Sequence, residues 1–199
     1  MLKAGAMLAV VLLGTTGCRF ERHHGTSNKD QDVKFDTPFG GMSVKTDEKA
    51  AQAGVGLTPY PGAMLNRKED GGKEDGAADV NLSFGSFHLG VKALSYQSGD
   101  APDKVLAFYR KDMAKFGTVI LCRDRVPLGQ PVRTQDGLTC DAESKGSNIH
   151  VSEDGQEDLK AGSRQHQHIV SVEAKNGGTK IGLVALDLPG NLGGDDSKE

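Results

Sequence analysis

The sequence predicts an α+β fold, in which a single antiparallel β-sheet carries one main α-helix packed on one face. Three observations support this prediction. Residues 100–117 have the apolar spacing of an amphipathic helix, residues 80–96 alternate apolar and polar side chains, and Asn176-Gly177-Gly178-Thr179 separates two further strand-like runs. A sheet with one apolar face needs a covering layer, and the sequence offers one substantial helix for it.

The helical segment has a signal at each end. Asp100 can accept a hydrogen bond from a free N–H of the first turn, and Pro102 lies where a missing N–H costs nothing. Gly117 suits a left-handed C-terminal cap. The apolar residues recur at spacings of four, four and three, which define one helix face: Val105, Tyr109, Met113 and Phe116. We expect this stripe to pack on the sheet and not to line a ligand groove.

The remaining elements are short. Residues 33–45 are predicted to form a hairpin that reverses near Pro38 and Gly40-Gly41, and residues 46–53 a short capped helix. The run 80–96 is one strand or two that turn at Phe84-Gly85-Ser86. Further strands are expected at 118–123, 138–141, 148–152, 167–175 and 180–188. The interior stretches 66–78 and 152–165 are polar, and Asp154, Glu157 and Asp158 in the second are predicted to lie in a solvated loop.

Residues 1–17 are predicted to be a secretory signal peptide. Lys3 precedes an apolar run at 4–13, which is shorter than the about 20 residues that span a bilayer. The run ends in Leu13-Gly14-Thr15-Thr16-Gly17-Cys18. This segment resembles the lipobox of bacterial lipoproteins, although Thr15 stands where that pattern usually has Leu. The resemblance implies that Cys18 is lipidated and becomes the mature N-terminus; the alternative is an ordinary signal peptide that leaves Cys18 as a thiol.

Composition suggests how the rest of the chain is divided. Residues 18–32 are predicted to be the lipidated N-terminus and a flexible tether, because they contain one large apolar residue. Residues 33–189 are predicted to form a single α+β domain, with the N-terminal hairpin at 33–45 and the main part at 55–189, and residues 190–199 a disordered tail. The formal net charge of -3 and the lack of a basic cluster argue against nucleic-acid binding.

The cysteines suggest a disulfide. There are three, so if Cys18 carries lipid, Cys122 and Cys140 remain as a pair in an oxidising compartment. A metal pair or a redox dithiol is the alternative, but there is no Cys-x-x-Cys spacing and no flanking His.

Histidines are the other candidate site residues. His166 and His168 are two apart, so on a strand they share a face, and His150 or Glu173 is a possible third ligand of a metal site. A solvated polar strand start is the favoured interpretation of the same residues. His23 and His24 lie in the expected tether, and no cofactor is predicted.

One longer pattern resembles a known group of proteins. Thr58-Pro59-Tyr60-Pro61-Gly62-Ala63 is followed by a strand and by a Val-x-x-Phe-Tyr helix that ends in Gly. This resembles uncharacterised bacterial envelope lipoproteins over about residues 33–188. The resemblance implies a fold and a compartment but no activity.

Two classes of function therefore remain open from the sequence. The first is a lipid-anchored, non-catalytic protein of the bacterial cell envelope, facing the periplasm or the cell surface, that binds a partner protein or envelope component. The alternative is a secreted metal-dependent hydrolase that uses His150, His166 and His168.

Overall fold

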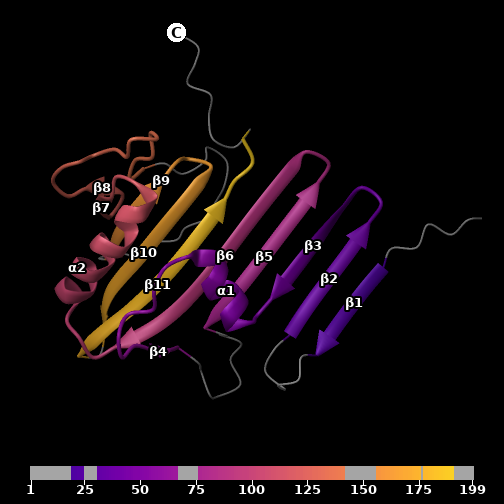
Figure 1. Ribbon diagram of the computed structural model, residues 1–199, viewed down its shortest axis with the longest axis horizontal. Coiled ribbons are helices and arrows are strands. Elements are labelled where there is room, and N and C mark those ends of the chain that lie inside the picture. Colours follow the sequence, from indigo (N-terminus) through magenta and orange to yellow (C-terminus); the bar gives the residue numbers. More distant parts are fainter. Residues whose placement is uncertain (1–18, 25–30, 67–75, 142–155, 176, 191–199) are drawn as a thin grey trace, which may run out of the picture.

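The structure is a computed structural model that describes residues 19–24, 31–66, 76–141, 156–175 and 177–190 of the 199-residue chain. These residues form a mainly-β fold, one antiparallel sheet of eleven strands with two α-helices (Figure 1). The strands are β1 (Arg19–His24), β2 (Gln31–Thr37), β3 (Gly40–Lys45), β4 (Met64–Leu65), β5 (Ala77–Phe84), β6 (Phe87–Ser98), β7 (Ile120–Arg123), β8 (Val126–Pro127), β9 (Glu157–Gly162), β10 (His166–Lys175) and β11 (Gly178–Asp187). The helices are α1 (Glu48–Val55) and α2 (Pro102–Asp112), and α2 continues into the 3₁₀ turn η1 (Met113–Phe116).

The strand order is β1-β2-β3-β5-β6-β11-β10-β9-β7-β8, and β4 pairs with β6. The hairpins β2–β3, β5–β6 and β10–β11 confirm the predicted reversals, and the run 80–96 is two strands and not one. Gly177, with φ of 79°, supplies the backbone conformation that the β10–β11 turn needs. The β10–β11 hairpin lies between β6 and β9 (Figure 1). It therefore connects strands β1–β6 on one side of it to strands β7–β9 on the other.

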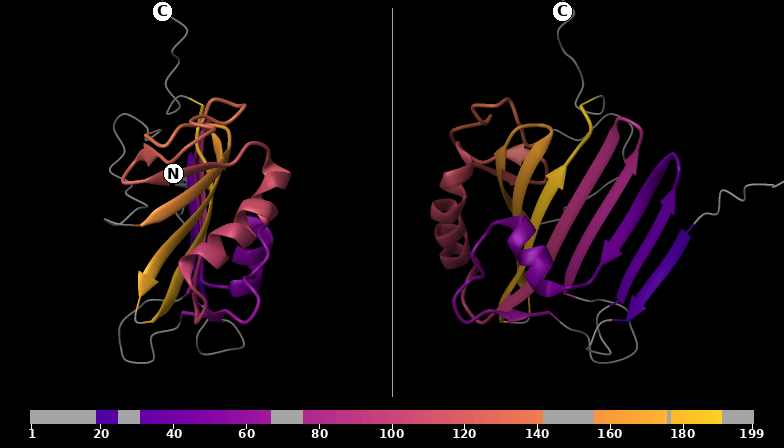
Figure 2. Two further views of the ribbon diagram at one scale, coloured as in Figure 1. Left: turned by 90° about the vertical axis from the view of Figure 1, so that its left-hand side faces the viewer. Right: turned by 45° about the vertical axis from the view of Figure 1, so that its right-hand side comes forward.

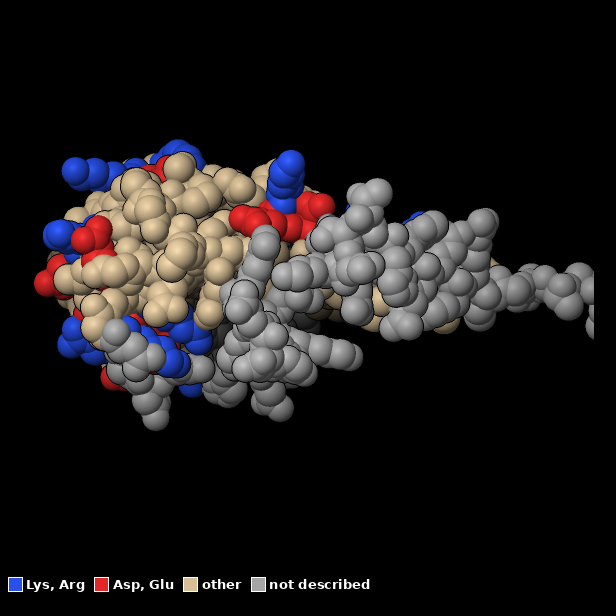
Figure 3. All heavy atoms as spheres, turned by 90° about the horizontal axis from the view of Figure 1, so that it is seen from below, with Lys and Arg blue, Asp and Glu red and all other residues tan. Residues whose placement is uncertain are grey.

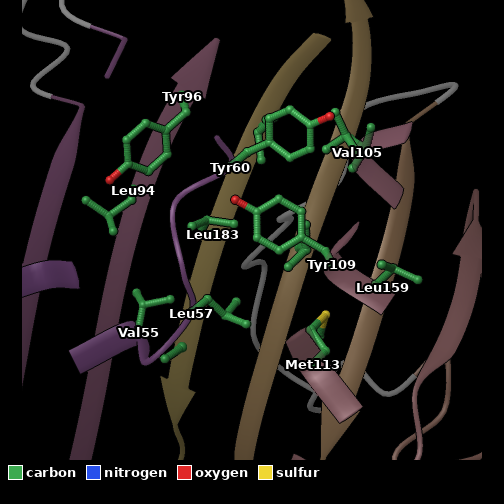
Figure 4. Packing of buried hydrophobic residues seen from close by; sticks show 14 of the residues in the cluster. Val55, Leu57, Tyr60, Leu94, Tyr96, Val105, Tyr109, Met113, Leu159 and Leu183 are labelled. Carbon is green, nitrogen blue, oxygen red and sulfur yellow. The ribbon is translucent and has the colours of Figure 1, made fainter. Parts of the chain in front are cut away.

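Both helices lie on one side of the sheet (Figure 2). Their apolar side chains form the main core with strands β5, β6 and β9–β11, as the close view of Val55, Tyr96, Tyr109 and Leu183 shows (Figure 4). Val105, Tyr109 and Met113 of the predicted stripe are fully buried there, so its packing on the sheet is confirmed. Neither described helix lies on the opposite side of the sheet, which we call the helix-free face.

The ends of the helix differ from the prediction. The residue before α2 is Ala101, which provides no side-chain cap, and Asp100 binds elsewhere: its carboxylate accepts hydrogen bonds from the Tyr60 hydroxyl (2.8 Å) and the Lys104 ammonium (3.1 Å). These two bonds lower the pKa of Asp100. The other end tightens into η1, and Gly117 has φ of 104° and ψ of -149°, which is not the left-handed helical cap.

The segment that precedes β4 is held against both ends of α2. The backbone N–H of Thr58 donates to Asp112 Oδ2 at 2.8 Å, near the end of the helix, while Tyr60 bonds Asp100 at its start. The Tyr60 ring also packs edge-on against Phe108, with centroids 5.2 Å apart. The Pro-rich entry predicted from sequence therefore lies along the helix and fixes its position on the sheet.

Three predictions of local structure are wrong. Residues 19–24 and 31–32, expected in a flexible tether, form β1 and the start of β2, because an edge strand needs backbone pairing on one side and tolerates charged residues. Residues 138–141 form no strand, because Gly137 has φ of 84° and the segment makes isolated bridges only. Residues 157–162, expected in a solvated loop, form the buried strand β9. The predicted strand at 148–152 lies outside the described residues.

Asp158 and Lys160 of β9 are buried because their charged groups are hydrogen-bonded. Asp158 Oδ1 accepts hydrogen bonds from Ser171 Oγ and Gln156 Nε2, both at 2.8 Å. Lys160 Nζ donates to the carbonyl oxygen of Cys140 at 3.0 Å. Buried polar groups are tolerated when they are hydrogen-bonded, so a sequence that looks solvated forms an interior strand.

Candidate functional site

His166 and His168 share one face of β10, as predicted. His166 pairs with Asp187 and His168 with Ala185 in the register of β10 and β11. The exposed His166 ring places Nδ1 at 2.9 Å from Asp187 Oδ1. This surface contact orients the imidazole ring, but two side chains are fewer than the three protein ligands of a catalytic zinc site.

His168 is part of the packing between helices and sheet. Its ring lies flat on the ring of Phe116, with centroids 3.5 Å apart and planes 5° from parallel. Its Nδ1 is buried and has no hydrogen-bond partner among the described residues. Burial lowers the pKa of His168, and a hydrogen bond with the backbone of Val55 opposes this. The ring therefore joins β10 to η1 and to the end of α1.

The proposed third ligands do not complete a metal site in the described chain. Glu173 lies an odd number of residues from both histidines, so it is on the opposite face of β10, where its carboxylate is 3.9 Å from Lys175 Nζ and 3.9 Å from Lys180 Nζ. The suggestion that Glu173 joins the two histidines is wrong. His150 lies outside the described residues. Across the described ranges, no group of three or more His, Cys, Asp or Glu side chains is placed to hold a metal ion.

The His168 contact predicts a pH dependence of stability. The unfolded chain has a histidine pKa near 6.5, and burial lowers that of the folded state. Above pH 6.5 the His168 imidazole is neutral in both the folded and the unfolded state. As the pH falls below 6.5 the unfolded state binds the proton more readily, so stability decreases until the pH reaches the lower folded pKa. Urea melts above and below pH 6.5 should show this loss, and His168→Phe, which keeps a ring on Phe116, should reduce it. An equal loss in the variant would contradict this origin.

The disulfide is present as predicted. Cys122, in β7, is bonded to Cys140, 18 residues later, and both side chains are buried. The bond closes a loop whose Thr134 Oγ1 donates to the Gly162 carbonyl at 2.8 Å. The loop therefore packs beside β9. Because the two sulfurs are bonded to each other, the metal-pair interpretation of these cysteines does not apply to this structure.

An apolar surface on the helix-free face was not predicted. Leu94 and Tyr96 face the helices, so the odd-numbered residues of β6 point away from them. Strand register then places Phe35, Met42, Leu82 and Leu89 in one row across four strands, and Val33, Val44, Val80 and Val91 in the next. The signal in the sequence was the apolar alternation in 33–44 and 80–91, from which we predicted a hairpin and strands but no exposed apolar surface.

The most exposed part of this surface is one corner of the sheet. Phe39 is 84% exposed, Phe84 48%, Met42 39% and Phe35 37%. Phe39 lies in the β2–β3 turn and Phe84 ends β5, and the N–H of Gly85 donates to the Phe39 carbonyl at 3.3 Å, which joins the two hairpin tips. Gly40 is needed here, because a Cβ would clash with the Ser83 carbonyl and the Phe84 ring. We call Phe35, Phe39, Met42 and Phe84 the aromatic corner.

The two faces of this part of the sheet differ in polarity. On the helix side, Lys34 and Asp36 form an ion pair at 2.9 Å, and Lys92 lies 3.9 Å from the largely buried Asp79. Figure 3 views the molecule from the end opposite the β2–β3 and β5–β6 turns, where acidic and basic side chains lie around an uncharged area. Within the described ranges, neither helix has the length and apolar character required to cross a membrane.

Comparisons with known proteins identify no relative. The chain matches no protein-family model, no curated protein and no solved structure at a significant level. Its function is therefore inferred from its own residues and their placement.

Proposed function

We propose that the protein is a lipid-anchored, non-catalytic component of the bacterial cell envelope that binds a partner protein or another envelope component. The observation that carries this proposal is the sequence before β1: Lys3, an apolar run at 4–13 and the lipobox-like segment that ends in Cys18 precede the strand, which begins at Arg19. A positive residue, a short apolar run and a cleavage site are the features of a secretory signal peptide, and the cysteine after that site supports lipidation.

The proposal also includes the fold class and the non-catalytic role of the protein. We assign the domain to the α+β class, because α1 and α2 provide the covering layer of its main core. The non-catalytic assignment is supported by the use of His168 in packing and of His166 in a surface contact with Asp187. The alternative, a metal-dependent hydrolase using His150, His166 and His168, has less support, because His168 already packs on Phe116 and bonds Val55.

The partner would contact the edge of the sheet farthest from β1. Strand β8 is the last in the strand order, and β1 is the first. The disulfide-closed loop at the β8 edge exposes Val126 and Val132. An anchor beside β1 leaves this loop farthest along the sheet from the lipid, where crosslinking in intact cells can identify what it binds.

The anchor is tested by Cys18→Ser. The variant is expected to lose membrane attachment and to remain unacylated, because each buried CH₂ of an acyl chain contributes about 0.8 kcal/mol and the serine variant has none. Membrane fractionation and fatty-acid labelling measure the two effects. Thr15→Leu, which restores the usual residue of the lipobox, is the matched control and should be processed at least as well as the natural sequence. Labelling that persists in the serine variant would refute the anchor.

A further inference from the structure

We propose that the aromatic corner (Phe35, Phe39, Met42 and Phe84) seats in the surface of the lipid bilayer beside the anchor. This rests on the proposed lipidation of Cys18 and adds to it a second, non-covalent membrane contact. The domain would then lie against the membrane at a fixed corner and would not swing on a tether.

The first argument is the position of the anchor. Arg19 pairs with Asp36 of β2, and the turn that carries Phe39 begins after Thr37. Strand β1 therefore starts at the same end of the sheet as the β2–β3 and β5–β6 turns (Figure 1). Cys18 lies one Cα–Cα step, about 3.8 Å, before Arg19. Acyl chains on Cys18 hold this corner at the boundary between lipid and water.

The second argument is the kind of side chain exposed there. Of the seven large hydrophobic residues with the greatest exposure among the described residues, four belong to this corner. Exposed apolar groups that cluster indicate a contact with a protein or a membrane, and the anchor next to them selects the membrane. The helix side of the same strands is charged, with the Lys34–Asp36 pair, so the corner has one face suited to lipid and one to water.

The third argument is that the two hairpin tips of the corner are joined. The two hairpin tips are hydrogen-bonded to each other through Gly85 and Phe39, and Phe84 lies over Gly40. A turn whose backbone is already held by its neighbour has less conformational freedom to lose when it enters the membrane interface.

The test uses the full-length chain as it is processed, bound to vesicles of phosphatidylethanolamine and phosphatidylglycerol. The protein has no Trp, so Phe39→Trp introduces a single reporter, and Phe84→Trp gives a second in case the first variant is damaged. Met64→Trp is the matched control: Met64 is 72% exposed, and its pairing with Gln97 places it at the opposite end of β6 from Phe87. Phospholipids with brominated acyl chains quench tryptophan that enters the bilayer.

We expect the emission of the Phe39→Trp and Phe84→Trp variants to shift to shorter wavelength and to be quenched several-fold more than that of Met64→Trp. Bound protein in which Phe39→Trp is no more quenched than the Met64→Trp control would overturn the inference and leave the anchor intact. A shift that depends on protein concentration, without quenching by brominated lipid, would show that a second copy covers the corner and would also overturn it. Protein that stays in solution in every case would refute both the anchor and the inference.

Discussion

Tyr109→Ala is expected to lower the free energy of unfolding by about 3–5 kcal/mol. The Tyr109 side chain is fully buried between α2 and the sheet (Figure 4). Its ring packs edge-on against Phe108, with centroids 5.0 Å apart, and lies 6.4 Å from the ring of Tyr60. Removing it leaves a cavity where the helix, the entry segment and the strands meet, and these elements cannot all move in to fill it.

Tyr109→Phe is the matched control for this prediction. Within the described chain the hydroxyl makes no hydrogen bond of good geometry, although it lies near the backbone of Tyr60, and burial raises its pKa. Deleting the hydroxyl while keeping the ring should therefore cost no more than about 1 kcal/mol. Chemical denaturation of the three proteins gives the comparison. A loss below about 0.5 kcal/mol for Tyr109→Ala would mean that the ring is exposed, as in a groove.

Loss of the disulfide is expected to destabilise the protein by about 3 kcal/mol, the chain-entropy estimate for a loop of this size. The bond joins Cys122 in β7 to Cys140 after a loop of turns. Without it, the unfolded chain gains freedom and the loop loses its fixed connection to the sheet edge. Melts of Cys122→Ser and Cys140→Ser should show similar losses.

The double variant separates the bond from the side chains. Because either single change removes the same bond, Cys122→Ser combined with Cys140→Ser should be no less stable than the worse single variant. Val126→Ser, an exposed change in the same loop, should alter stability by less than about 0.5 kcal/mol. Two reactive thiols in the denatured, unreduced domain lacking Cys18 would contradict the pairing.

The elements predicted correctly are those whose signals are local. The turn at Gly177, the reversal near Pro38 and the apolar stripe through Tyr109 each depend on neighbouring residues, so sequence spacing is sufficient. Strand β9 was missed because its stability comes from distant partners: Ser171 binds Asp158, and the Cys140 carbonyl binds Lys160. Strand β1 was missed because edge pairing uses backbone groups, which leave little mark on composition.

Less of the candidate site than of the fold could be predicted from the sequence. The alternation of β10 correctly placed His166 and His168 on one face, but nothing local indicates that Phe116 would cover His168. The aromatic corner needed strand order as well as alternation. Phe35 and Leu82 belong to one apolar surface because Met42 lies between them, and that neighbourhood follows from the pairing of β3 with β5.

The place of the last hairpin determines when this chain can fold. Strands β10 and β11 join β6 to β9, and they are the last two strands along the described chain. Until β10 and β11 have been synthesised, the earlier strands of the described chain are two separate groups that no strand connects. Pairing between segments so far apart is slow, because the loop entropy is lost before the contacts form.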